Sequence, residues 1–68
     1  MKEVKISYNF KKLKGKPKRL LENLGYKIKS YGVLNDTVTL IFLSDSDDTT
    51  KTALQELKEL GILKHSIR

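Results

Sequence analysis

The stretch EVKISYNF, residues 3–10, alternates strictly between apolar and polar side chains. One set contains Val4, Ile6, Tyr8 and Phe10, and the other contains Lys5, Ser7 and Asn9. Successive side chains of a strand point to opposite faces of a sheet, so this period of two predicts a strand with one buried face. The rest of the chain has to supply partners for that apolar face.

Two helices and three further strands are predicted after this strand. Their ranges are a helix over about 17–24, a strand over 26–33, a strand over 37–43, a helix that follows an acidic cap at 44–48 and ends at Gly61, and a last strand over 62–67. Apolar spacing begins as early as Phe10, but Pro17 would remove a backbone hydrogen bond to Leu13 at a cost of ~3 kcal/mol. A loop before Pro17 is therefore favoured over an earlier helix start.

Local signals mark the ends of these elements. Pro17 suits the first turn of a helix, and Gly25 and Gly61 suit the left-handed residue that follows a helix. The pair Asn35-Asp36 predicts a tight turn between two strands. Ser46 or Asp47 can cap the second helix by accepting a hydrogen bond from its first free N–H groups.

The resulting element order is βαββαβ. Right-handed crossovers turn this order into one four-stranded antiparallel sheet with both helices on one face, which is the ferredoxin-like arrangement of the α+β class. We expect a single domain over residues 1–68. The predicted core contains Val4, Ile6, Tyr8, Leu20, Leu21, Leu24, Ile28, Val38, Leu40, Phe42, Leu54, Leu57 and Leu60, with one or two residues of the last strand.

Composition excludes several classes of site. The chain has no cysteine, which excludes disulfides, thiolate metal sites and thiol catalysis, and its single histidine, His65, cannot build a metal site alone. No apolar run approaches the ~20 residues of a membrane helix. We therefore expect a cytoplasmic protein that is not an enzyme and needs no cofactor or metal.

The basic side chains are concentrated in one segment. Of the fourteen Lys and Arg residues, six lie between residues 10 and 19, where there is no acid, and the other eight are matched by eight carboxylates. A concentrated positive patch attracts polyanions such as nucleic acid, although a solvated basic loop is the simpler alternative. The predicted binding residues are Lys11, Lys12, Lys14, Lys16, Lys18 and Arg19, with support from Lys27 and Lys29.

The uncovered face of the sheet suggests an alternative function. The second strand is expected to place Tyr26, Ile28 and Ser30 on the covered face and Lys27, Lys29 and Tyr31 on the open face. Together Tyr31, Val33, Ile41 and Leu43 would form a partly apolar surface for a second copy of the chain or a partner protein. An acidic protein surface is instead an alternative to nucleic acid as the target of the basic segment. Readout of RNA on this face is not expected, because Lys5, Ser7, Asn9, Thr39 and Ile41 occupy positions where RNA-recognition motifs place aromatic residues.

Two short patterns resemble a known type of domain. Leu21-x-x-Leu24-Gly25-Tyr26-x-Ile28-x-Ser30 and Leu57-x-x-Leu60-Gly61-Ile62 are similar to the helix-to-strand joins of small ACT-type and NIL-type regulatory domains. The resemblance implies a ferredoxin-like unit that dimerises through its sheet and binds a small ligand or transmits regulation. The loop after the first strand is basic here over residues 11–16, so no ligand-binding residue is carried over.

Overall fold

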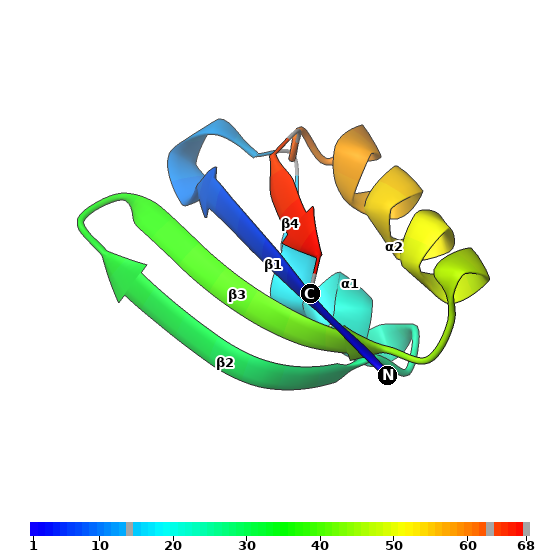
Figure 1. The fold of residues 1–68 in the computed structure, drawn as a ribbon. Coiled ribbons are helices and arrows are strands. Elements are labelled where there is room, and N and C mark those ends of the chain that lie inside the picture. Colours follow the sequence, from blue (N-terminus) through cyan, green and yellow to red (C-terminus); the bar gives the residue numbers. More distant parts are fainter. Residues whose placement is uncertain (14, 63, 68) are drawn as a thin grey trace.

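The computed structural model describes residues 1–13, 15–62 and 64–67 of the chain (Figure 1). Its elements are β1 (Lys2–Asn9), the 3-10 helix η1 (Phe10–Lys12), α1 (Pro17–Asn23), β2 (Lys27–Leu34), β3 (Thr37–Ser44), α2 (Asp47–Glu59) and β4 (His65–Ile67). Every strand and helix expected from the sequence is present, with shifts at the ends. The 3-10 helix was not predicted, and Lys14 lies outside the described residues.

The four strands form one antiparallel sheet in the order β2-β3-β1-β4. β1 lies beside β3 over its whole length, with Val4 opposite Phe42 and Tyr8 opposite Val38. β4 pairs with the middle of β1, where Ile6 lies opposite His65. A four-stranded antiparallel sheet with two helices confirms the α+β class.

One face of the sheet carries the hydrophobic core. The alternation of β1 buries Val4, Ile6 and Tyr8, and β3 adds Val38, Leu40 and Phe42 on the same face. Both helices cover this face, through Leu21 of α1 and through Ala53 and Leu57 of α2. The predicted core is thus largely confirmed. Leu24 is an exception with 48% of its surface exposed, because α1 ends at Asn23 and leaves Leu24 at the helix end, outside the core.

The ends of the elements follow the expected local chemistry. Pro17 occupies the start of α1, and Gly25 follows that helix with a φ of +93°. Asn35 adopts a φ of +57° in the turn between β2 and β3. Ser46 caps α2, since its side chain accepts a hydrogen bond from the N–H of Thr49 while the Thr49 hydroxyl accepts one from the Ser46 N–H.

The alternation of the first strand stops one residue earlier than predicted. Asn9 is the last residue of β1, and its side-chain oxygen accepts a hydrogen bond from the Lys11 N–H at 2.9 Å. That contact caps η1, so Phe10 leaves the sheet as the first residue of a helical turn. Phe10 is 46% exposed, and the expectation that it shares the buried face of β1 is wrong.

A β-bulge in β2 changes which residues face the helices. Ile28 lies opposite Phe42, but Ser30 lies opposite Ile41, so Lys29 is the extra residue. Opposed residues of an antiparallel pair share a face, and a bulge shifts the alternation by one. Tyr31 and Val33, opposite Leu40 and Val38, therefore lie on the helix face. The predicted assignment of Tyr31 and Val33 to the open face is wrong.

The first helix is much shorter than the hairpin beside it. α1 has 7 residues and a length of ~10 Å, whereas the 8 residues of β2 span ~26 Å. The β2–β3 hairpin extends well past both helices in Figure 1. The helix face of β2 beyond its midpoint is thus left without a covering element.

No helix in the described ranges has the length and apolar character needed to cross a bilayer.

Candidate binding groove and cationic surface

The predicted binding residues that the structure describes lie in three places. Lys16, Lys18 and Arg19 stand at the start of α1, and Lys11 and Lys12 belong to η1. Lys27 and Lys29 lie at the other end of the sheet, because Lys27 and Glu3 are both opposite Leu43. Glu3 is six residues from the end of β1, or ~20 Å along the strand. The structure therefore does not bring Lys27 and Lys29 together with the other predicted binding residues.

Carboxylates neutralise only some of these cations. Lys11 Nζ lies 3.4 Å from Asp36 Oδ1, and Lys18 Nζ lies 3.3 Å from Glu22 Oε1. Lys29 pairs with Glu3 on the open face of the sheet. Exposed pairs of this kind contribute ~0–1 kcal/mol and are readily exchanged for another anion.

Three cations near the start of α1 make no ion pair with any described residue: Lys12, Lys16 and Arg19. Together with Lys11 and Lys18 they form what we call the cationic surface. We define it as Lys11, Lys12, Lys16, Lys18 and Arg19. Its residues are carried by two short elements that follow one another in the chain, η1 and the start of α1.

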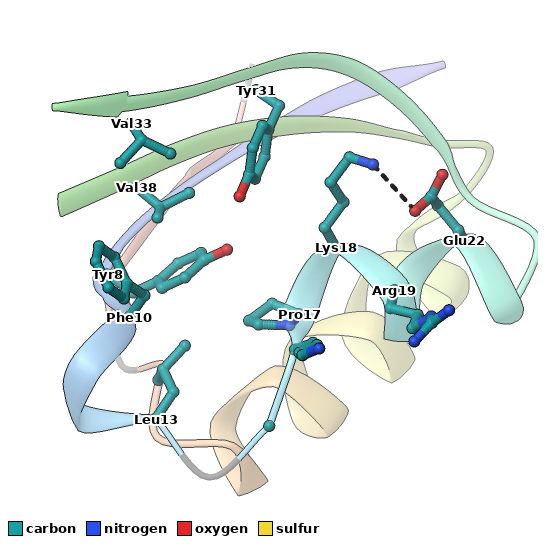
Figure 2. Close-up of a pocket in the computed structure, with 12 residues that line it drawn as sticks. Tyr8, Phe10, Leu13, Pro17, Lys18, Arg19, Glu22, Tyr31, Val33 and Val38 are labelled. Atoms are coloured by element: carbon teal, nitrogen blue, oxygen red, sulfur yellow. Dashed lines mark hydrogen bonds and ion pairs between the residues drawn. The ribbon is translucent and has the colours of Figure 1, made fainter. Parts of the chain in front are cut away.

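A groove of about 960 Å³ lies between α1 and the overhanging part of the hairpin (Figure 2). Its floor is formed by Tyr8 and Val38 and one wall by Tyr31 and Val33 of the hairpin. The opposite side is formed by Leu13, Pro17, Lys18, Arg19 and Glu22, with Phe10, Gly15 and Lys16 completing the lining. The sequence pattern did not predict this groove, because the groove depends on the bulge in β2 and on the shortness of α1.

The segment below the groove is held by close packing against the end of α2. A Cβ placed on Gly15 would come within 2.9 Å of Leu60 Cδ2, which is too close for any other residue without a shift. Leu13 packs against the core beside this contact. A shift of the far end of the Leu60 side chain would relieve this contact, and Lys16 and Pro17 follow Gly15 directly into the groove lining.

Two tyrosine hydroxyls point into the groove in Figure 2, one from Tyr8 and one from Tyr31. Burial of Tyr8 raises the pKa of its phenol from 10.0 to about 12, with a smaller contribution from the neighbouring Tyr31. Lys18 Nζ lies 5.5 Å from the centre of the Tyr31 ring, within the range of a cation–π contact. The groove thus combines apolar walls, two neutral phenols and a basic rim.

The buried phenol of Tyr8 predicts a loss of stability at alkaline pH. Below about pH 10 the phenol is protonated in both states, whereas between pH 10 and about 12 only the unfolded chain releases the proton. The free energy of unfolding should then fall by at most about 2.7 kcal/mol, an upper limit because the groove is open to water. Tyr8→Phe should lack this fall.

Urea unfolding of wild type and Tyr8→Phe at about pH 9 and about pH 11.5 measures the effect. Every other ionisable group, including Tyr26 with its raised pKa, is present in both proteins, so the comparison isolates Tyr8. An equal loss of stability in the two proteins would contradict the prediction.

The open face of the sheet offers a smaller apolar surface than the sequence predicted. Ile41 and Leu43 lie on it, opposite Lys5 and Glu3, and both are half-buried. Tyr31 and Val33 lie on the helix face, so the four residues expected to form one partner surface are split between two faces. The prediction that these four residues form a single apolar patch is therefore wrong.

The described residues contain no group of three or more His, Cys, Asp or Glu side chains arranged to hold a metal ion. The groove and the cationic surface are the features with a distinct chemical character. In comparisons with known proteins the chain matches no family model, no curated protein and no solved structure, so its function has to be inferred from these two features.

Proposed function

We propose that this protein is a non-enzymatic module that binds nucleic acid through the cationic surface. The observation that carries the proposal is a set of three cations that form no ion pair with a described residue, Lys12, Lys16 and Arg19, together with Lys11 and Lys18 on η1 and at the start of α1. Phosphate oxygens need positive charge without a fixed geometry, and flexible lysines provide it. Binding is then mainly electrostatic and weakly dependent on base sequence.

We further infer a ferredoxin-like arrangement of the domain. The order of its strands in the sheet, β2-β3-β1-β4, and the position of each helix between two strands support this arrangement. The 3-10 helix η1 is then an insertion between the first strand and the first helix. The inserted η1 and the start of α1 would then together carry the binding function, with the sheet as their scaffold.

The salt dependence of oligonucleotide binding tests the proposed function. If three to five phosphates of a single strand are engaged, the plot of log K against log salt should have a slope of about −2.1 to −3.5. Affinity should fall roughly 20- to 130-fold between about 50 and 200 mM salt. Fluorescence anisotropy of a labelled mixed-sequence strand measures it. A slope shallower than about −1, or no binding at the lower salt concentration, would overturn the proposal.

A further inference from the structure

We propose that the groove between α1 and the hairpin receives an unstacked base of a single-stranded nucleic acid whose phosphates lie on the cationic surface. This inference rests on the proposed function and names the class of nucleic acid that the site takes. It assigns to Tyr31 and Phe10 the role of contacting the base. It also places the bases on the helix side of the sheet and leaves the open face unused.

The first support is the exposure of apolar and aromatic surface where the cations gather. Tyr31 is 48% exposed, Val33 54% and Phe10 46%, and all three line the same groove. Burial of these side chains would stabilise a small domain, so their exposure beside a basic rim supports a role in binding a ligand. Base–aromatic stacking of ~1–3 kcal/mol per base uses the flat surface of a ring, and the adjacent cations hold the backbone.

The second support is the pair of hydroxyls inside the groove. Figure 2 shows the phenol oxygens of Tyr8 and Tyr31 pointing into the space between the hairpin and α1. Both can donate and accept hydrogen bonds, so either can meet the carbonyl, amino or ring nitrogen groups of a base edge. The floor itself is formed by Tyr8 and Val38, which carry no ionic group, and the charged residues of the lining are Lys16, Lys18, Arg19 and Glu22. A neutral planar ring with polar edges fits this interior better than a free inorganic anion does.

The charges around the groove indicate where the strand runs. Glu22 lines the groove beside Lys18, and its carboxylate would repel a phosphate placed at that end. Lys16 and Arg19 make no ion pair with a described residue, so the nearest phosphates should lie there. Lys11 and Lys12 extend the positive surface beyond the groove along η1. A ligand that uses both parts is longer than a single nucleotide.

The lysine above the Tyr31 ring explains how the groove can be filled at low cost. Lys18 Nζ occupies the ring face at 5.5 Å and also pairs with Glu22 at 3.3 Å. A base that stacks on Tyr31 displaces this ammonium group, which remains near Glu22 or moves to a phosphate. Bases in a duplex are already stacked and paired, so only a single strand can offer a base to the ring.

The first experiment compares strands with and without bases, using the wild-type protein. We expect a dT strand of about 12 nucleotides to bind roughly 10-fold more tightly than an abasic strand of the same length and than a duplex of the same length. Anisotropy at fixed salt measures the three affinities. Equal affinity for the dT strand and the abasic strand would overturn the inference, because phosphates alone would then account for binding.

The second experiment removes the aromatic rings but keeps an apolar side chain. Tyr31→Leu combined with Phe10→Leu should weaken binding of the dT strand by about 5- to 150-fold, the range expected for one stacked base. Binding of the duplex should change less than twofold. Tyr31→Phe keeps the ring and serves as the matched control, with binding of the dT strand within about threefold of wild type. Loss of affinity for strand and duplex alike would contradict a base site.

The outcomes separate this inference from the proposed function. Steep salt dependence with no preference for bases means that the cationic surface binds nucleic acid and the groove does not take a base. Absence of binding to every strand removes both proposals. Displacement of the dT strand by a poly-glutamate peptide at matched charge and equal affinity would also overturn the base site, because the groove would then add nothing specific to nucleic acid.

Discussion

Phe42→Ala is expected to lower the free energy of unfolding by about 3–5 kcal/mol. Phe42 is the largest fully buried side chain and has no exposed surface. Its ring also meets Tyr26 edge to face, with ring centres 5.5 Å apart and planes at 75°. Removing it opens a cavity between β3 and the helices that the short α1 cannot refill. At ~0.05–0.15 kcal/mol per residue, a chain of 68 residues has about 3–10 kcal/mol in total, so the variant should lose about a third of its stability or more and be largely unfolded at the lower end of this range.

The chain provides a matched control for this substitution. Its other phenylalanine, Phe10, is 46% exposed, so Phe10→Ala removes the same atoms from a half-exposed position. We expect Phe10→Ala to cost less than about 1 kcal/mol. Urea unfolding followed by circular dichroism measures both variants. Similar costs for the two would mean that the core is not centred on β3.

Neutralising three cations of the cationic surface is expected to weaken single-strand binding about 100-fold at 0.1 M salt. The variant combines Lys12→Gln, Lys16→Gln and Arg19→Gln, which form no ion pair with a described residue. Each lost phosphate contact should make the plot of log K against log salt shallower by ~0.7, or by ~2.1 in all. Stability should change little, because all three side chains are exposed.

A second triple variant controls for net charge. Lys5→Gln, Lys27→Gln and Lys51→Gln also remove three positive charges from exposed positions, but on the open face of the sheet and on α2. This variant should weaken single-strand binding less than about fivefold, because it reduces only the long-range attraction of the protein's total charge. The slope of log K against log salt should be nearly unchanged. If both triple variants weaken binding equally, the protein attracts nucleic acid by its total charge and has no defined surface.

Much of the fold follows from local rules. The alternation in β1, the apolar run of β3 and the helical spacing of α2 predict these elements because each carries one clear period. Pro17, Gly25, Asn35 and Ser46 stand where the chain changes conformation, and each acts through its own backbone or side chain. Such signals need no knowledge of distant residues, which is why the sequence reveals them.

The bulge at Lys29 is a different kind of feature. Nothing in the composition of β2 marks Lys29 as an extra residue, since a lysine fits an edge strand with or without a bulge. Its position is set by the pairing with β3, where Ile28 and Tyr31 both have to meet apolar partners. Alternation continued past this point puts Tyr31 and Val33 on the wrong face. The groove could not be predicted for the same reason.

The cations illustrate the same division. Their clustering along the chain predicts a positive region, and Lys16, Lys18 and Arg19 do lie together beside the groove. Which of them are neutralised depends on contacts between segments, such as that of Lys11 with Asp36 in the distant hairpin turn. The separation of Lys27 and Lys29 from the rest depends on the direction in which β2 runs. The ion pair and this separation arise only when the chain folds, so the order of residues along the chain does not reveal them.

The part of β2 that contains Tyr31 and Val33 lies at the edge of the sheet, pairs with β3 alone, and leaves both side chains about half exposed. Segments with so few buried contacts open at low cost compared with the core. The wall of the groove at Tyr31 and Val33 is therefore its least constrained side, whereas the floor at Tyr8 and Val38 is fixed by the core. If a base binds there as proposed, the space that a purine needs beyond a pyrimidine would come from this wall, which would keep binding weakly dependent on base identity.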